Sequence, residues 1–319
     1  MTAFERLGLG NTATNQGNIS ENQHQTDKTF GFKWAKRETY ESPASKANMR
    51  RWLIERYCSG DDHKLDVWLG GSRKLILDAG CGAGFSGLLF FGDRLKEHDY
   101  LGVDISSAVD VAKSRFVETG IPGDFLQCDL SDLPIPDHSV DIIFSEGVLH
   151  HTDSTEQSLK YLAKKLVVDG RMMFYVYRKK AVIREYTDDY IRNELSHLDD
   201  ESAWEKLKPL TKLGIALGKL NVEVCVEEDI PMLGIQAGKM DLQRFFYWNI
   251  CKAYYRQEFD FDEMHHINFD WFRPLNCHRH TPEEVQLWCE EAGLQIEHMD
   301  VQEAGITVVA RKEEESCYE

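Results

Sequence analysis

The chain has 319 residues, enough for one large domain or two of modest size. It carries 37 Lys and Arg residues against 54 Asp and Glu residues, so its formal net charge is −17. This charge disfavours a protein that binds nucleic-acid backbones broadly or lies on an anionic membrane surface. The hydrophobic share of 42% and the charged share of 29% exclude a disordered chain.

The sequence shows no pattern typical of secretion or membrane insertion. Its first 25 residues are polar, and nowhere do about 18 apolar residues follow one another. Its eight cysteines are scattered and form no CxxC pair, which favours reduced thiols over a disulfide framework. We therefore expect a cytoplasmic protein without a membrane partner; the sequence leaves its oligomeric state open.

The N-terminal region differs in composition from the rest. Residues 1–27 are rich in Asn, Gln, Thr and Gly and are expected to be mobile. Residues 28–72 are expected to form a helical lid, in which a helix begins at Ser42-Pro43 and ends near Cys58.

From Arg73 onward, short apolar runs that end in polar residues alternate with helical stretches. This alternation predicts an α/β fold with a doubly wound, mostly parallel sheet. Two further strands follow a helix that begins at Thr281-Pro282, which gives seven strands in all. The strands are expected over 74–78, 100–104, 124–129, 140–145, 171–177, 295–301 and 306–310, and the helices over 85–96, 109–118, 155–166 and 281–293.

Residues 178–280 interrupt the alternation after the fifth strand and are expected to form an inserted helical and aromatic cap. Helices are predicted over 183–197, 201–219 and 239–257, followed by an irregular aromatic loop. The sheet domain would then comprise 73–177 and 281–312, with a C-terminal tail over 313–319.

The strongest motif lies where the first strand meets its helix. Asp78 is followed by Gly80, Gly82 and Gly84, and glycines at a strand-to-helix turn let the backbone approach a ligand closely. Gly82-x-Gly84-x-x-Gly87 also satisfies the dinucleotide fingerprint, with Asp104 at a suitable distance for a ribose. This motif by itself leaves open a nicotinamide cofactor and a plain tight turn.

Three further motifs follow in order: Asp104, then Cys128-Asp129-Leu130, then residues 133–145 (LPIPDHSVDIIFS). Together with the glycine block they resemble the class I S-adenosylmethionine-dependent methyltransferase superfamily. Within it, the chain resembles small-molecule enzymes of the ubiquinone and menaquinone biosynthesis type. The resemblance covers about 73–177 and, more loosely, 281–312. It implies a Rossmann-like methyltransferase fold and S-adenosyl-L-methionine as cofactor.

The resemblance also implies roles for individual residues. The three glycines would line the methionine part of the cofactor, with Asp78 fixing the loop or reaching the amino group. Asp104 would accept both ribose hydroxyls. Asp129 would accept from the adenine amino group, and Ser145 would lie near the sulfonium. A competing interpretation is that an acid here only caps a helix or turn. The cofactor residues implied are Asp78, Gly80, Gly82, Gly84, Asp104, Asp129, Leu130 (against the adenine ring) and Ser145, with Glu146 beside Ser145 near the acceptor.

Two features argue against competing functions. A nicotinamide site has no use for Asp129, and this glycine block begins with an acid, Asp78. Methyltransferases that act on exocyclic amino groups of nucleic-acid bases carry an Asn/Asp-Pro-Pro-Tyr/Phe motif after the fourth strand. This chain carries Ser145-Glu146-Gly147-Val148 there instead. A small-molecule acceptor is therefore favoured and nucleic acid disfavoured. Methylation of a protein or tRNA, and a non-catalytic cofactor-sensing role, stay open as alternatives.

Catalytic candidates follow the fourth strand, where the acceptor is expected. Histidine side chains in general titrate near neutrality, so His150 and His151 could act as a base, as could Glu146. The alternative is that these histidines cap a helix or pack in the interior.

Substrate candidates lie in the lid and in the insert. Residues 241–272 hold eleven aromatic residues and six acids, which suggests a pocket for an amine or sulfide. The histidines and cysteine over 265–280 lack metal-ligand spacing, so no metal is expected. Arg37 and Arg50 could pair with the cofactor carboxylate. The substrate-binding residues predicted are Trp34, Tyr40, His265, Asp270 and Trp271.

Overall fold

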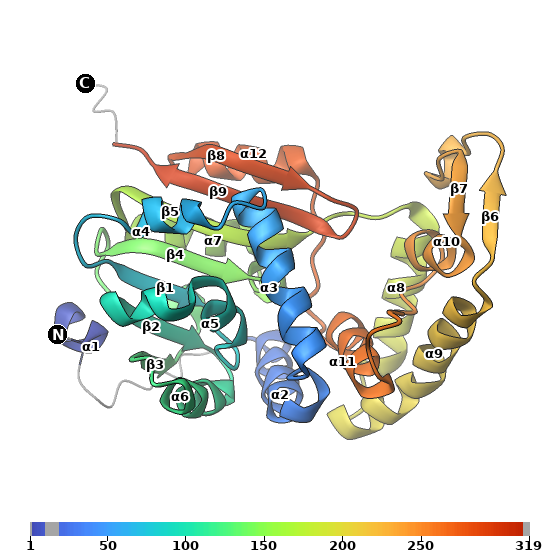
Figure 1. Ribbon diagram of the computed structural model, residues 1–319, viewed down its shortest axis with the longest axis horizontal. Coiled ribbons are helices and arrows are strands. Elements are labelled where there is room, and N and C mark those ends of the chain that lie inside the picture. Colours follow the sequence, from blue (N-terminus) through green and yellow to red (C-terminus); the bar gives the residue numbers. More distant parts are fainter. Residues whose placement is uncertain (1, 10–18, 315–319) are drawn as a thin grey trace. The chain divides into compact units, whose positions relative to one another are not determined.

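The computed structural model describes residues 2–9 and 19–314. The chain divides into two compact units, and each is described by itself (Figure 1). Unit 1 comprises residues 1–35, 47–178 and 278–319, and unit 2 comprises 36–46 and 179–277. Unit 2 thus corresponds closely to the predicted insert, with a short segment of the predicted lid added.

Unit 1 is built on a seven-stranded sheet of order β3-β2-β1-β4-β5-β9-β8. Strand β9 runs antiparallel to both β5 and β8, and the remaining pairs are parallel. This confirms the predicted doubly wound, mostly parallel α/β fold. The strands are β1 Leu75–Ala79, β2 Asp99–Asp104, β3 Asp124–Gln127, β4 Val140–Glu146, β5 Leu166–Tyr177, β8 Leu294–Val301 and β9 Gly305–Lys312.

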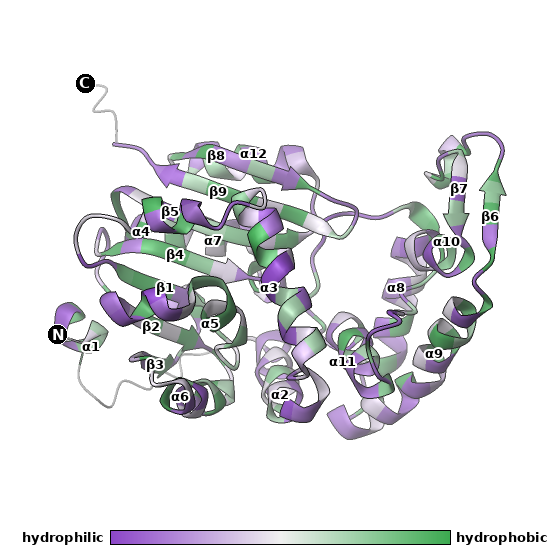
Figure 2. Ribbon diagram, viewed as in Figure 1, coloured by the Kyte–Doolittle hydropathy of each residue, from purple (hydrophilic) through white to green (hydrophobic). Residues whose placement is uncertain are grey.

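Helices flank this sheet on both sides (Figure 1). Strands β1 and β2 are buried along their whole length, as expected for parallel strands covered on both faces, and Figure 2 shows hydrophobic residues concentrated on the central strands. The helices are α1 Ala3–Leu7, α2 Glu21–Ala35, α3 Pro43–Cys58, α4 His63–Leu69, α5 Phe85–Phe91, α6 Ala108–Thr119, α7 Thr155–Lys165 and α12 Pro282–Glu291, where α3 begins in unit 2 and continues in unit 1.

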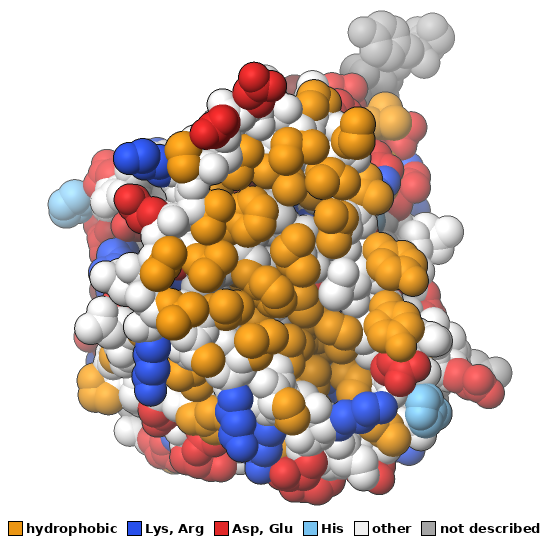
Figure 3. Space-filling view, turned by 90° about the vertical axis from the view of Figure 1, so that its right-hand side faces the viewer, with side chains coloured by type: hydrophobic (Ala, Val, Ile, Leu, Met, Phe, Trp, Pro, Cys, Tyr) orange, Lys and Arg blue, Asp and Glu red, His pale blue; other side chains and the backbone are white. Residues whose placement is uncertain are grey.

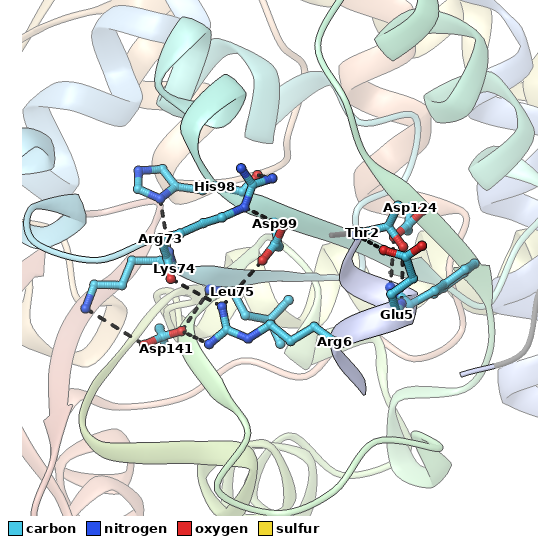
Figure 4. A network of polar contacts seen from close by, with 11 residues as sticks. Thr2, Glu5, Arg6, Arg73, Lys74, Leu75, His98, Asp99, Asp124 and Asp141 are labelled. Atoms are coloured by element: carbon cyan, nitrogen blue, oxygen red, sulfur yellow. Dashed lines mark hydrogen bonds and ion pairs between the residues drawn. The ribbon is translucent and has the colours of Figure 1, made fainter. Parts of the chain in front are cut away.

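The N-terminal segment is more ordered than its composition predicts. Helix α1 is fixed by Arg6, whose Nη2 donates to Asp141 at 2.9 Å and whose Nη1 lies 3.5 Å from Asp99 (Figure 4). Asp141 also accepts the amide of Leu75, so one carboxylate joins α1 to the start of β1. Within the segment predicted to be mobile, α1 and the first part of α2 are helical, and residues 1 and 10–18 lie outside the described residues. The ion pairs of Arg6 join α1 to the sheet, and no apolar periodicity in the sequence could reveal them.

Unit 2 consists of four helices and a two-stranded antiparallel sheet within the described residues. The irregular loop predicted over 265–274 is wrong, because most of it belongs to helix α11. Asp260 and Glu263 form a capping box that starts this helix. The third helix, predicted over 239–257, is shorter in the structure. Its first residues belong to β7, and the helix ends at Asn249. The elements are α8 Val182–Leu195, α9 Asp200–Leu220, β6 Glu223–Val226, β7 Gly238–Asp241, α10 Leu242–Asn249 and α11 Phe261–Phe272.

Unit 2 exposes several large apolar side chains. On α8 they recur every four residues and therefore lie on one helix face. Figure 3, which views the side of the molecule where these elements are drawn, shows hydrophobic side chains gathered over much of it. This surface is apolar in spite of the chain's net charge. The exposed residues are Val182, Tyr186, Tyr190, Leu213, Leu220, Val222, Met232 and Met240.

No helix among the described residues combines the length and the apolar character needed to cross a membrane.

Candidate functional site

The glycine loop follows β1 and turns into α5. The amides of Gly80 and Cys81 both donate to the carbonyl of Val103, at 2.7 and 2.9 Å, which ties the loop to the end of β2. Gly80 and Gly82 have φ values of +83° and +50°, a region that L side chains rarely adopt. A Cβ at Gly80 would overlap the side chain of Val148. The loop therefore requires glycine for both its backbone conformation and its close packing.

Asp104, the last residue of β2, organises the same loop. Its Oδ2 accepts the amide of Gly82 at 2.8 Å, and its Oδ1 accepts the amide and the hydroxyl of Ser106 at 2.8 and 2.6 Å. Burial raises the pKa of this carboxyl, while the hydrogen bonds from Ser106 and Gly82 and the nearby Lys33 oppose the rise. A carboxylate oxygen offers two acceptor positions, so Oδ2 retains one for a ligand hydroxyl.

Asp78 is buried beneath the loop near the end of β1. It accepts a hydrogen bond from the hydroxyl of Tyr100. Burial is the main cause that raises the pKa of Asp78 to about 7, partly offset by this hydrogen bond. The side chain is thus held by Tyr100 of β2, and its two predicted roles, fixing the loop or reaching the amino group of the cofactor, stay predictions.

Helix α2 lies against the glycine loop. A Cβ at Gly82 would come within 2.7 Å of Nε1 of Trp34, so the indole contacts the loop backbone directly. Lys33 is buried, its Nζ lies 3.9 Å from the Trp34 ring centroid, and its charge lowers the pKa of Asp104. The predicted lid residue Trp34 therefore lies where the motif predicts a ligand. Lys33 was missed because a lysine in a polar helix carries no sequence signal for burial.

Asp129, Leu130 and Ser145 have structural partners of their own. Asp129 accepts the amide of Ser131 at 2.7 Å and caps a short 3-10 helix over Leu130–Asp132. Leu130 is buried in the main hydrophobic cluster, and the hydroxyl of Ser145 donates to Ala79 at 2.9 Å. The turn-capping alternative thus describes Asp129 in this structure, and its contact with adenine stays a prediction.

Glu146, at the end of β4, is held by α3. Its Oε1 pairs with Nη2 of Arg56 at 2.5 Å, and its Oε2 accepts the hydroxyl of Tyr57 at 2.6 Å. The Arg56 guanidinium carbon lies 3.3 and 4.1 Å from the ring centroids of Trp52 and Tyr175. Both oxygens of Glu146 are thus engaged, which favours a positioning role over that of a base.

His150 and His151 lie in a buried aromatic cluster after β4. The His150 ring centroid is 3.7 Å from that of Tyr177, and the His151 centroid is 5.1 Å from that of Phe30 on α2. The backbone of His150 also accepts the amide of His278 at 2.9 Å. These contacts agree with the packing alternative, and a catalytic role for either histidine stays a prediction.

Residues 77–174 match the family model described as a methyltransferase domain. The matched segment runs from β1 to β5 and contains the glycine loop, Asp104 and Glu146. Residues 77–174 therefore form a methyltransferase domain. The match agrees with the predicted family over this segment, and S-adenosylmethionine is the cofactor that the resemblance to that family implies.

The methyltransferase domain is similar to curated proteins over part of their length. An uncharacterized methyltransferase of Bacillus subtilis, YcgJ, is 31% identical over 169 residues, which cover 51% of this chain and 64% of that protein. The probable tRNA methyltransferase 9B of Bos taurus is 32% identical over 116 residues, which cover 35% of this chain and 23% of that protein. The chain thus spans less than two thirds of each relative.

Solved methyltransferases show distant similarity. A SAM-dependent methyltransferase from Aquifex aeolicus is 14% identical with a TM-score of 0.45, and the alignment covers 87% of this chain and 97% of that one. Magnesium protoporphyrin IX methyltransferase from Synechocystis PCC 6803, solved with bound SAH, is 13% identical with a TM-score of 0.46, over 92% and 100% of the two chains.

The residues of the methyltransferase domain fit its cofactor. The glycine loop leaves its backbone open to close approach, and Asp104 retains an acceptor position for a ribose hydroxyl. Arg115 on α6 donates to the carbonyl of Ala83 and so fixes the far side of the loop. Arg115 was not predicted, because nothing in the spacing of α6 distinguishes it from a surface arginine.

The remaining predicted residues belong to unit 2 or to the surface. His265 is buried, with Nδ1 2.8 Å from the Thr211 hydroxyl and Nε2 2.9 Å from the Trp204 carbonyl, and burial is the main cause that lowers its pKa to about 4. Tyr40 is buried with its ring centroid 5.1 Å from that of His266. Both residues are therefore placed to pack unit 2, and a direct contact with substrate stays a prediction.

The two arginines expected to pair with the cofactor carboxylate have other partners. Arg37 pairs with Glu41 at 2.6 Å, and Arg50 pairs with Asp62 at 2.5 Å on the exposed side of α3. Among the described residues, no group of three or more His, Cys, Asp or Glu side chains could hold a metal ion.

Trp34→Ala tests whether α2 contributes to cofactor binding. Removing an indole that lies on the glycine loop should weaken S-adenosylmethionine binding about tenfold, because a partly buried aromatic ring contributes about 1.5 kcal/mol or more. Isothermal titration calorimetry measures the change. Lys28→Ala, an exposed position of the same helix, is the matched control. Equal affinities for the two variants would exclude Trp34 from the site.

Proposed function

We propose that this protein transfers the methyl group of S-adenosylmethionine to a small-molecule acceptor. The observation that carries the proposal is the position of the glycine loop and Asp104 at the carboxyl ends of β1 and β2. Parallel α/β sheets bind ligands at this edge. Trp34 of α2 lies against the same loop. We also propose a cytoplasmic location, on the sequence observation that the eight cysteines are scattered and form no CxxC pair.

The residues of unit 1 are proposed to hold and orient the cofactor. Gly80, Gly82 and Gly84 would hold its methionine part, and Asp104 would accept a ribose hydroxyl. When bound, S-adenosylmethionine supplies a methyl carbon activated by a positive sulfur, ready for in-line displacement. Trp34 would exclude water from one side, which matters because alignment and a dry site are most of what such a displacement needs.

The acceptor side is proposed to lie near the ends of β4 and β5. His151 is the candidate to remove a proton from an acceptor that loses one, with His150 packed beside it at 4.3 Å between ring centroids. Glu146 is proposed to position this edge through Arg56 and Tyr57. A contact of Asp270 or Trp271 with the acceptor stays a prediction from the sequence.

A small molecule is favoured over a macromolecule on charge and on sequence. The formal charge of −17 disfavours an extended nucleic-acid contact, and Ser145-Glu146-Gly147-Val148 departs from the motif of base amino methyltransferases. One relative is a probable tRNA methyltransferase, but the similarity covers 23% of its length. Methylation of tRNA or protein is therefore the competing outcome of the test.

The direct experiment is a methylation screen. Purified protein is incubated with S-adenosylmethionine and a metabolite extract, and mass spectrometry follows S-adenosylhomocysteine release together with metabolites that gain one methyl group. We expect release that depends on a small-molecule fraction and is lost in Asp104→Ala. Release that occurs only with purified tRNA or protein would replace the proposed acceptor class, and no release with any fraction would favour a cofactor-sensing protein.

A further inference from the structure

Strands β6 and β7 of unit 2 form a sheet with only two strands. Neither strand has a second neighbour in the part of the chain that the structure describes, and Figure 1 draws β6 at the outer edge of unit 2. A sheet of two strands is marginally stable in water unless a further strand or a packed helix supports it. Helix α10 packs against both strands but adds no hydrogen-bonded neighbour to either. The outer edge of β6 is therefore open.

The register of this sheet gathers its apolar side chains on one face. Val222, Val224 and Val226 alternate with polar residues along the chain and therefore point to the same side. Met240 of β7 stands directly opposite Val224 and shares that side. Val224 and Val226 are half-buried, whereas Val222 and Met240 are exposed. Unit 2 thus covers only part of this apolar face.

The apolar surface around the sheet has the size that a dimer requires. Leu220, just before β6, is 57% exposed, and Met232, between the two strands, is 82% exposed. Together with Leu213, Val222 and Met240 they expose on the order of 400 Å², taking about 150 Å² for one large free side chain. A standard interface covers about 800 Å² of each partner, somewhat more than half of it apolar. Figure 3 shows that apolar side chains gather into one field on this side.

The backbone of β6 is oriented to pair with one more strand. The carbonyl of Val222 accepts the amide of Leu242 at 2.8 Å, so the even-numbered residues of β6 direct their backbone groups toward β7. The backbone groups of Glu223 and Cys225 consequently point away from β7, and both residues are exposed. Strand edges that avoid pairing often carry Lys or Pro, and residues 222–226 contain neither.

We propose that β6 pairs antiparallel with β6 of a second copy of this chain and so joins the two sheets into one of four strands. A homodimer with a two-fold axis uses the same patch on both copies, which suits a single apolar face beside a single open edge. The interface lies wholly within unit 2, and it goes beyond the proposed function without depending on it.

The side chains of β6 select the register of this pairing. A two-fold axis at Val224 places Val222 opposite Val226 of the second copy, which continues the apolar row across the interface. The outward backbone groups of Glu223 then meet those of Cys225 of the second copy. An axis at Cys225 would place Glu223 opposite Glu227, and like charges directly opposite each other destabilise a sheet. The axis is therefore assigned to Val224.

Sedimentation equilibrium of the full chain tests the interface. We expect a reversible dimer, with twice the mass of one chain. Val222→Lys places an ammonium in the apolar row of each copy and should raise the dimer dissociation constant at least tenfold. Val117→Lys, which changes an equally apolar residue of α6 that is 77% exposed, is the matched control and should leave the constant unchanged.

A change confined to the backbone tests strand pairing itself. Cys225→Pro removes an amide that points away from β7, so it should weaken the dimer at least tenfold while the hydrogen bonds to β7 remain. Cys225→Ser keeps the amide and should associate like the wild type. Far-ultraviolet circular dichroism checks that each variant is folded. A monomeric wild type, or equal association of Val222→Lys and Val117→Lys, would overturn the interface.

Cysteine cross-linking tests the register. Glu223→Cys places a thiol opposite Cys225 of the second copy, at the Cα separation of about 5.5 Å typical of a hydrogen-bonded pair, which a disulfide can span. Mild oxidation followed by non-reducing electrophoresis should show a covalent dimer for this variant. Glu223→Cys/Cys225→Ser lacks the opposing thiol and should stay uncross-linked. A disulfide through Cys225 in the wild type, with none gained in Glu223→Cys, would overturn the axis at Val224.

Discussion

Asp104→Ala is expected to weaken S-adenosylmethionine binding about 10- to 100-fold. The wild-type carboxylate accepts three hydrogen bonds, from the amide of Gly82 and from the amide and hydroxyl of Ser106. Alanine leaves these donors without their partner and also removes the proposed acceptor for the ribose. Because hydrogen bonds to a charged group contribute about 1.5–3 kcal/mol each, even one lost ligand contact gives a change of this size.

Calorimetric titration with S-adenosylmethionine and S-adenosylhomocysteine measures the change. Asp93→Ala is the matched control, because Asp93 is an aspartate of the same unit whose side chain is 83% exposed and pairs with Lys96 on the surface. Far-ultraviolet circular dichroism checks that both variants are folded. An affinity within twofold of the wild type would exclude Asp104 from the cofactor site.

The fold could be predicted from the sequence because local and global patterns agree. Continuous apolar runs such as Leu75–Ala79 form the buried parallel strands, and the polar residues that end them meet at one edge of the sheet. The glycines of the loop were also predictable, since their positive φ values require that residue. The cofactor loop therefore follows from rules that act within a few residues.

The misplaced elements depend on contacts that no local pattern reports. Helix α11 contains His265, His266 and Asn268, polar residues that suggested a loop; in the structure they are buried with partners such as Thr211. Asp188 lies in an acid-rich stretch of α8, yet it is buried and accepts hydrogen bonds from Arg184 and Trp271. A buried polar residue and a surface one look alike in sequence until their partners are known.

The same reason explains what was missed at the candidate site. Lys252 and Arg56 are basic residues of an ordinary kind in the sequence, and only the structure shows that both are buried against aromatic rings. Arg56 pairs directly with Glu146 at 2.5 Å. Arg56 is therefore expected to stabilise the fold.

Arg56→Met should lower the free energy of unfolding by about 3–5 kcal/mol. The substitution leaves Glu146 buried with Tyr57 as its remaining partner, and an uncompensated buried charge is costly. It also removes the contact of Nη1 with the hydroxyl of Thr307 on β9, at 3.2 Å. Urea denaturation followed by tryptophan fluorescence measures the loss of stability. Arg171→Met is the control: it breaks a partly exposed pair with Glu297 and should lower the free energy of unfolding by about 1 kcal/mol or less.

A double-mutant cycle then separates positioning from catalysis at Glu146. In Arg56→Met/Glu146→Leu neither charge remains, so the loss of stability should be smaller than the sum of the two single losses.

Glu146→Gln keeps an acceptor for Tyr57 and should stay folded. If Glu146 positions the acceptor edge, Glu146→Gln and Arg56→Met should lower turnover to a similar extent, because each breaks the same pair. If Glu146 acts as a general base, kcat should fall far more in Glu146→Gln than in Arg56→Met. That result would contradict the positioning role.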